Sequence, residues 1–314
     1  MYHIIVNPAS KSGKGAKYFK LLEQYLNNNQ VPYTVSFSKR IGHVTELVRD
    51  LTKNLDNSSN SISIIIVGGD GTLNESLQGI CNFDKVRLSY IPTGSGNDFA
   101  RDLQLPKDPV ENLKHILKNP QETLIDLGKV SYQVAEGHSE SRYFVVSCGL
   151  GFDAAVCEAV YHSPFKKVLN RIGLGKTIYL LKALQLLIKN EPTKGTLTLE
   201  DSKKTLLFDD IFLAAGMNHK FEGGGFMFAP HANNSDGYLD ICLANNISKW
   251  KVLQVLPKAF HGNHTKYKEI YSQQCSCYTL HTETALCLQT DGEIPAYTDS
   301  LTVSCVPKLL HFYN

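Results

Sequence analysis

Hydrophobic positions in the first part of the chain follow two periods in turn. Short apolar runs predict strands, several of them buried, and these runs fall at residues 3–7, 31–37, 62–67 and 86–91. Between and after them, apolar residues recur at helical spacing, which predicts helices at 14–27, 44–55, from 73 onward, near 98 and at 110–117. Strands that alternate with helices predict an α/β domain with a parallel, doubly wound sheet.

The pattern changes near residue 128, after which short strands and turn signals dominate. The predicted strands lie at 129–134, 143–147, 195–200, 205–215, 238–243, 278–289 and 301–306, and mostly helical stretches interrupt them at 165–190 and 249–261. We therefore expect an α/β domain over 1–128 and a β-sandwich over 129–306. The last segment, 307–314, is expected to return to the first domain.

Charge and hydropathy exclude several classes of protein. The 32 basic and 30 acidic residues leave a formal net charge of +2, too even for a protein that binds nucleic acid over its whole surface. No run approaches the ~18 to 20 apolar residues of a membrane span, and Pro8 interrupts the apolar start before a signal-peptide core forms. We expect a cytoplasmic protein. Cys275 and Cys277 form a C-x-C pair, which alternation would place on one face of a strand as packing residues.

Two glycine-rich turns carry the candidate chemistry. GGDGTLN at 68–74 follows the strand at 62–67, and PTGSGNDF at 92–99 follows the strand at 86–91. Glycines let the backbone approach a phosphate, a helix N-terminus favours negative charge, and a carboxylate can hold Mg²⁺. Neighbouring parallel strands end at one edge of a sheet, where NPASKSGKG at 7–15 adds lysines and hydroxyls. The pattern predicts a phosphate site, with tight strand-to-helix turns alone as the alternative.

The familiar nucleotide motifs do not account for these turns. Neither contains GxxxxGK[ST], and Phe99 stands where the third glycine of GxGxxG belongs. A P-loop and an ordinary dinucleotide fingerprint are therefore both disfavoured.

The three segments, in this order and at these strand ends, resemble the diacylglycerol kinase catalytic-domain family of soluble bacterial lipid kinases, related to sphingosine and ceramide kinases. The resemblance extends along nearly the whole chain, through IDLG at 125–128, GLGFD at 149–153, NSDGYLD at 234–240 and DGE at 291–293. It implies a nucleotide domain like that of NAD kinase and phosphofructokinase, with a β-sandwich second domain. It also implies ATP- and Mg²⁺-dependent phosphorylation of a hydroxyl of diacylglycerol or a related lipid, with ATP between the domains.

The resemblance assigns the nucleotide site and the catalytic groups residue by residue. The nucleotide-binding positions would be Asn7, Ser38, Gly68, Gly69, Asp70, Gly71, Thr72, Leu73, Asn74 and Ser95. Asp70 would serve the Mg²⁺ and phosphate region, and Glu293 would accept the proton of the attacking hydroxyl. Ser38 departs from the family, because many relatives have threonine there. Without the family context, Glu293 would be interpreted as a solvated turn carboxylate.

A structural Mg²⁺ site in the second domain is also implied by the resemblance. Its positions would be Asn233, Asp236 and Tyr238, with Asp236 binding through its side chain and the other two through backbone carbonyls. An ordinary turn of Asn, Ser, Asp and Gly is the alternative.

Two other functions stay open at this stage. One is a kinase of a soluble hydroxyl, such as NAD or a sugar, and the other is a protein that binds ATP without turnover. A lipid kinase needs an apolar slot in its second domain, whereas a soluble substrate needs a polar pocket. The basic, acid-free stretch 165–190, with Lys166, Lys167 and Arg171 in its first half, predicts peripheral contact with a membrane, with a core-packing helix as the alternative. A homodimer is left open.

Overall fold

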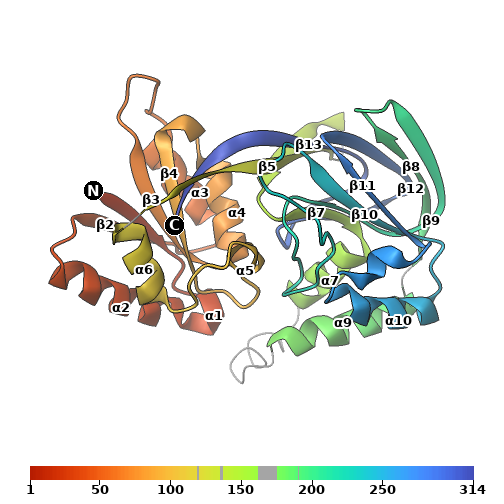
Figure 1. The fold of residues 1–314 in the computed structure, drawn as a ribbon, viewed down its shortest axis with the longest axis horizontal. Helices are drawn as coiled ribbons and strands as arrows, with labels where there is room; N and C mark the ends of the chain where they lie inside the picture. Colours follow the sequence, from red (N-terminus) through yellow and green to blue (C-terminus); the bar gives the residue numbers. More distant parts are fainter. Residues whose placement is uncertain (119, 135–136, 162–174, 190) are drawn as a thin grey trace. The chain divides into compact units, whose positions relative to one another are not determined.

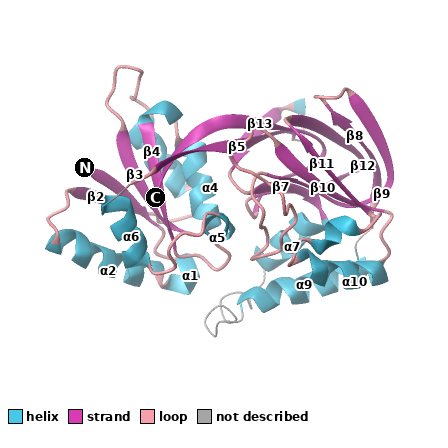
Figure 2. Ribbon diagram, viewed as in Figure 1, coloured by secondary structure: helices cyan, strands magenta, loops and turns pink. Residues whose placement is uncertain are grey.

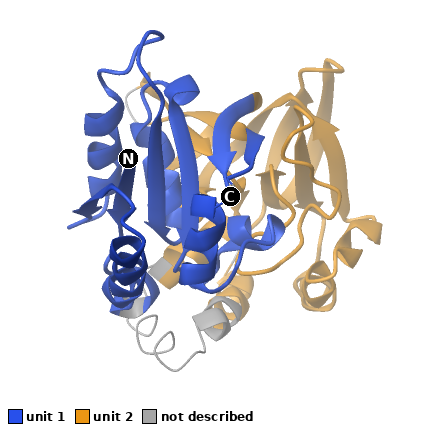
Figure 3. Ribbon diagram, turned by 60° about the vertical axis from the view of Figure 1, so that its left-hand side comes forward, with its two compact units in different colours: residues 1–125, 308–314 blue, residues 126–307 orange. Residues whose placement is uncertain are grey.

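The structure is a computed structural model that describes residues 1–118, 120–134, 137–161, 175–189 and 191–314. These residues form two compact units (Figures 1 and 3), Met1–Ile125 with Lys308–Asn314, and Asp126–Pro307. The sequence-based division was 1–128 with 307–314, and 129–306. Two strands, β5 (Glu122–Gln133) and β13 (Glu293–Tyr313), run through both boundaries.

A parallel sheet forms the centre of the first unit. Its strands are β1 (Tyr2–Val6), β2 (Tyr33–Phe37), β3 (Ile62–Gly68) and β4 (Val86–Pro92). They pair in the order β2-β1-β3-β4, all in parallel, and the end of β13 adds a parallel partner to β4 through Phe312 and Leu88. Parallel pairing brings the carboxyl ends of β1, β3 and β4 to one edge, where the loops of the candidate site begin.

Helices cover both faces of this sheet (Figure 2). They are α1 (Ser10–Gly13), α2 (Gly15–Asn28), α3 (His43–Thr52), α4 (Asp70–Gly79), α5 (Asp98–Asp102) and α6 (Pro109–Lys118), with a 3₁₀ turn at Phe83–Lys85. On one face, Leu22 of α2 and Leu113 of α6 pack with Ile65 of β3. Ile64 and Ile66 of β3 alternate to the other face and are fully buried, and Figure 1 shows α3 and α4 on that side.

The second unit is antiparallel. Its strands, besides the parts of β5 and β13 that lie in it, are β6 (Ser139–Phe144), β7 (Ser147–Gly151), β8 (Thr193–Leu199), β9 (Lys204–Met217), β10 (Leu239–Asn245), β11 (Ile270–Cys275) and β12 (Cys277–Thr290). They pair in the order β11-β10-β9-β7-β12-β13, while β8 bridges β12 and β9 and β6 pairs with β5. One core lies among these strands, with Leu197, Leu243 and Val303 as members.

A second core lies between the strands and three helices. The helices are α7 (Phe152–Tyr161), α9 (Gly175–Lys189) and α10 (Lys249–Ala259), and a 3₁₀ turn at Asn263–Lys266 follows. Val156 of α7, Leu187 of α9 and Val252 of α10 pack against Phe212 of β9 and Ala244 of β10. The three helices therefore cover one face of the β9–β10 pair.

Two strand predictions for this unit were wrong in detail. Residues 143–147 were expected to form one strand, but β6 ends at Phe144 and β7 begins at Ser147, because the backbone there turns to donate hydrogen bonds to Asp291. The C-x-C pair does not share one strand face, since Ser276 separates β11 from β12 and its N–H donates to Asp201 over 2.6 Å.

Candidate active site

Three loops at the carboxyl ends of β1, β3 and β4 interlock through side-chain hydrogen bonds. Asn7 joins the first to the second, because its Nδ2 donates to Thr72 Oγ1 over 3.0 Å. Its Oδ1 accepts from the Ala9 N–H over 3.0 Å, which holds the first loop itself. The Ser10 and Thr93 hydroxyls, 2.8 Å apart and buried, join the first loop to the third. The three loops therefore form one assembly.

Glycines let the second and third loops touch through their backbones. A Cβ on Gly94 would lie 2.6 Å from Gly69 Cα, and one on Gly69 would lie 3.2 Å from Gly94 Cα. Gly68 has no room either, because a Cβ there would lie 2.4 Å from the Thr72 Cβ. Any residue larger than glycine at these positions would push the two loops apart. At the same place α4, a helix of ten residues, presents its N-terminal N–H groups. This cradle fits a phosphate chain.

Two carboxylates lie at the same edge. Asp70, the first residue of α4, accepts a hydrogen bond through Oδ2 from the Asp98 N–H over 3.2 Å. Asp98 begins α5 and pairs with Arg101, Oδ1 to Nη1, over 3.0 Å. Burial, and then the charges of Asp70 and Asp98, raise the pKa of Tyr90 well above its usual range. Two carboxylates, one of them paired with Arg101, thus lie beside the glycine cradle, and a divalent cation can bind between carboxylate and phosphate oxygens in such a place.

The remaining predicted nucleotide positions are less uniform. Ser95 is exposed at the tip of the third loop, and Ser38 is half-buried after β2, with its N–H donating to the Val6 carbonyl over 2.9 Å. Gly71 lies in the first turn of α4. Leu73 and Asn74 are fully buried within α4, so their side chains pack in the unit interior and leave only backbone for a ligand.

Glu293 belongs to the second unit, at the first position of β13. A tight turn precedes it, with Asp291 at φ 51° and Gly292 at φ 84°, as a two-residue hairpin requires. Asp291 anchors this turn, because its carboxylate accepts the N–H groups of Val145, Val146 and Ser147 over 2.8 to 3.0 Å. Glu293 itself is half-buried. The turn therefore holds the Glu293 backbone in a fixed position.

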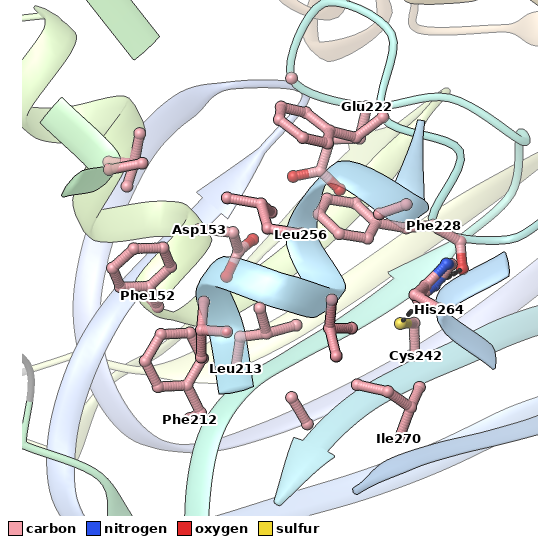
Figure 4. Close-up of a pocket in the computed structure, with 18 of the residues that line it drawn as sticks. Phe152, Asp153, Phe212, Leu213, Glu222, Phe228, Cys242, Leu256, His264 and Ile270 are labelled. Carbon is pink, nitrogen blue, oxygen red and sulfur yellow. Dashed lines mark hydrogen bonds between the residues drawn. The ribbon is translucent and has the colours of Figure 1, made fainter. Parts of the chain in front are cut away.

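A deep apolar pocket lies in the second unit, between the helices and the β9–β10 pair (Figure 4). The space inside it, which includes the open mouth, is about 860 Å³. Its wall consists mainly of aliphatic and aromatic side chains, Phe212, Phe226, Val252 and Leu256 among them.

Two carboxyl groups reach into this apolar pocket, those of Asp153 and Glu222 (Figure 4). Burial raises the pKa of Asp153 to about 6. Gln289 lies between them, with its Nε2 3.1 Å from Glu222 Oε1 and 3.4 Å from Asp153 Oδ2. The Gln289 Oε1 accepts from the Gly292 N–H over 2.9 Å. One amide thus connects the carboxyl pair of the pocket to the turn that carries Glu293.

The predicted metal positions 233–238 lie in an exposed turn of the second unit. Asp236 Oδ1 accepts from the Tyr238 N–H over 3.0 Å, and its Oδ2 is 3.5 Å from Gln274 Nε2. The Asn233 side chain accepts from the Ser235 hydroxyl over 3.0 Å. Burial, and then the charge of Asp236, raise the pKa of Asp240. The hydrogen bonds are those of the ordinary turn named as the alternative, and the carboxylates would suit a cation as well.

No cluster of three or more His, Cys, Asp or Glu residues arranged to hold a metal occurs in the described part of the chain. The Mg²⁺ expected here would not need one, because Mg²⁺ commonly binds through one or two carboxylates and substrate phosphates.

Several residues of the two sites were missed from the sequence. Asn97 closes the third loop, since its Oδ1 accepts from the Gly94 N–H over 2.9 Å. Asp126 holds the 234–237 turn, because its Oδ2 accepts from the Gly237 N–H over 2.7 Å. Asn97 stands in PTGSGNDF and Asp126 in IDLG, and these two motifs were the available signal. Glu222 stands outside every motif, and only the fold brings it to Asp153.

Comparisons with known proteins define the class. Residues 1–130 match the diacylglycerol kinase catalytic domain, and residues 145–314 match the YegS C-terminal NAD kinase beta sandwich-like domain. A solved diacylglycerol kinase from Bacillus anthracis str. Sterne has a TM-score of 0.68 at 20% identity, covering 100% of this chain and 96% of that one. Yeast NADH kinase has a TM-score of 0.51 at 8% identity, covering 100% and 82%. At these identities, both comparisons show similarity of the fold alone.

Among curated relatives, "Putative lipid kinase YtlR" of Bacillus subtilis is 28% identical over 95% of this chain and 94% of its own length. The diacylglycerol kinase of Mycobacterium tuberculosis is 28% identical over 79% and 75%. The chain belongs to the family in which a diacylglycerol kinase catalytic domain is followed by a YegS C-terminal NAD kinase beta sandwich-like domain, and the second model alone covers more than half of it. Membership places it among kinases that phosphorylate a lipid hydroxyl.

Proposed function

We propose that the protein uses ATP and Mg²⁺ to phosphorylate a hydroxyl of diacylglycerol or a related lipid. The observation that carries the lipid part is the pocket of the second unit, whose wall is mainly aliphatic and aromatic apart from the carboxyl groups of Asp153 and Glu222. A kinase of NAD or a sugar would need a polar pocket there. The acyl part of the substrate would lie along Phe212, Phe226 and Leu256.

The first unit would hold the nucleotide phosphates. The backbone of Gly68, Gly69 and Gly94 leaves room for them, and the N-terminus of α4 would stabilise their negative charge. Asp70 would hold Mg²⁺, which when bound neutralises charge on the transferring phosphoryl group. Asn7 and Thr72 keep the loops in register through their hydrogen bond, with Ser38 and Ser95 at the rim.

Glu293 would act as the proton acceptor for the lipid hydroxyl. Its turn is anchored by Asp291 and Gln289, so the backbone that carries this carboxylate is already held in place before a substrate binds. Phosphoryl transfer depends mainly on positioning and charge neutralisation. We therefore expect the glycine loops and Mg²⁺ to contribute more to the rate than the base does.

A second Mg²⁺, at Asn233, Asp236 and Tyr238, remains our proposal for stabilising the second unit. The nearby carboxylates of Asp236 and Asp240 support it, because burial and the charge of Asp236 raise the pKa of Asp240. A cytoplasmic location and peripheral attachment to a membrane also remain predictions. Among the described residues, no helix is both long and apolar enough to cross a membrane.

The test is incubation of the purified protein with γ-labelled ATP and Mg²⁺ in three arms. The arms contain diacylglycerol in mixed micelles, NAD, and a set of free sugars, and products are separated by chromatography. We expect label only in the lipid arm, and Glu293→Gln run beside the wild type should remove it. Label only in NAD or sugar would replace the lipid assignment, and no label in any arm would favour nucleotide binding without turnover.

A further inference from the structure

Helices α9 and α10 each present an apolar stripe to solvent, in addition to the stripe that packs inward. On α10 the outward residues include Trp250 and Leu253, and Trp250 is 79% exposed. On α9 they are Leu181, Leu184 and Ile188, and Ile188 is 75% exposed. Surface helices of soluble proteins normally carry polar residues there. An exposed apolar stripe of this kind marks an interaction site.

The two stripes belong to one surface. The inward faces of both helices, with Ala183 and Leu187 on α9 and Val252 and Val255 on α10, share one core. Lys249 at the start of α10 donates through Nζ to the Ile188 carbonyl near the end of α9 over 2.6 Å. Figures 1 and 2 show the two helices next to each other below the strands of their unit. Since the inward faces converge, both outward stripes face away from the same core.

The charged residues of the two helices have one sign. Neither α9 nor α10 contains an Asp or Glu. Lysines flank both stripes along the helices, and they are Lys182 and Lys189 on α9 and Lys249, Lys251 and Lys258 on α10. In a chain whose net charge is only +2, this concentration of positive charge calls for a negatively charged partner.

We propose that this α9–α10 face docks on the headgroup layer of an anionic lipid bilayer, with Trp250, Leu184 and Ile188 entering the apolar boundary. Trp favours that boundary because its ring is apolar and its N–H is polar, and lysines around it attract anionic lipid. The same helices line the lipid pocket with their inner faces. The proposal rests on the proposed function in one respect, because a lipid substrate must be taken from a membrane. Lys166, Lys167 and Arg171, the basic residues expected to dock, lie outside the described residues.

Trp250 provides a direct test, because it is the only tryptophan of the chain. Its emission reports on this face alone. Vesicles of equal parts phosphatidylcholine and phosphatidylglycerol should shift that emission to shorter wavelength, and brominated acyl chains should quench it. Vesicles of phosphatidylcholine alone should do neither. Binding without quenching would place the contact elsewhere and overturn the proposal, as would equal effects of both vesicles.

Matched variants identify the groups involved. Lys189→Gln with Lys258→Gln should weaken binding about 30-fold, since each lysine near an anionic surface contributes about fivefold. The control pair, Lys203→Gln with Lys204→Gln, removes equal charge at the far end of β8, roughly 20 Å along the strand, and should bind like wild type. Equal loss in both pairs would refute the α9–α10 assignment.

The apolar part is tested by Leu184→Gln with Ile188→Gln, against Leu207→Gln, an exposed leucine on β9. The first should abolish quenching of Trp250 and the second should leave it unchanged. If light scattering shows instead a dimer that the first variant dissociates, without vesicles, the face joins two copies and the membrane proposal fails.

Activity separates this proposal from the proposed function. The lysine pair variant should lose turnover on vesicles but keep it on a short-chain diacylglycerol dispersed as monomers. A wild type that quenches on anionic vesicles yet phosphorylates no lipid would refute the kinase assignment and leave the docking face standing.

Discussion

Replacing Asp153 by Asn should stabilise the protein above about pH 6 relative to wild type. Asp153 is buried against apolar walls, shares hydrogen bonds with Glu222 and Gln289, and has a pKa of about 6 instead of 3.8 because of that burial. A folded-state pKa above the unfolded value means that the folded protein holds a proton that the unfolded chain has lost. Stability therefore falls as pH rises through the window from about 4 to about 6.

The magnitude follows from the shift. Two pKa units correspond to about 3 kcal/mol at 1.36 kcal/mol per unit, and Glu222 can carry part of the charge, so we expect a cost of roughly 2 kcal/mol above pH 6. An asparagine carries no charge at any pH. For a unit of this size, ~2 kcal/mol raises the melting temperature by roughly 4 to 8 °C.

The assay is thermal unfolding followed by circular dichroism from pH 4 to 8. The melting temperature of Asp153→Asn minus that of wild type should be near zero at pH 4, grow between about 4 and 6, and stay constant above. Asp209→Asn, at an exposed position on β9, is the matched control and should show no such rise. A difference that is independent of pH, or that favours wild type at pH 8, would refute a raised pKa at Asp153.

The remaining predictions concern the two units separately. Glu293→Gln should keep nucleotide binding but lower turnover at least ~10²-fold, and near-normal turnover with saturating lipid would remove Glu293 from the mechanism. Gly69→Val should prevent ATP binding, because its Cβ would lie 3.2 Å from Gly94 Cα. Asp70→Asn, in contrast, should bind ATP and nearly abolish turnover. Unchanged Mg-ATP affinity of the Gly69 variant in calorimetry would contradict the loop assignment. Asp236→Ala should reduce the rise in melting temperature that Mg²⁺ gives without ATP, and an equal rise in variant and wild type would place the cation elsewhere.

Regular periodicity made the first unit predictable. The run at 62–67 became β3, Ile62–Gly68, and the helix expected over 110–117 became α6, Pro109–Lys118. A short run of apolar, β-branched residues predicts a buried strand, and apolar residues at helical spacing predict a helix with one buried face. The type of element therefore follows from the local sequence. Both glycine turns were found for the same reason, since they follow recognisable strands.

Contacts that depend on tertiary structure could not be predicted. Glu222 lies close to Asp153 in space but far from it in sequence. Glu222 stands in an irregular loop and Asp153 in the first turn of α7, and no spacing rule connects the two. The break at Val145 also depends on a distant residue, Asp291. The helical stretch 165–190 showed both apolar and basic residues, and α9 uses its two faces differently, with Leu187 buried and Ile188 exposed. Amphipathic spacing alone does not say which apolar stripe packs inward.

The return of β13 to the first unit has a consequence for how the protein is made. Phe312 pairs with Leu88 and packs edge-on against Phe99, and the Asn314 and Gln121 backbones exchange hydrogen bonds over 3.0 and 3.3 Å. The first unit is therefore incomplete until the chain through residue 314 has left the ribosome, after the whole second unit has been synthesised. Its β4 edge stays open during that interval, and we expect this edge to be where a nascent chain needs a chaperone.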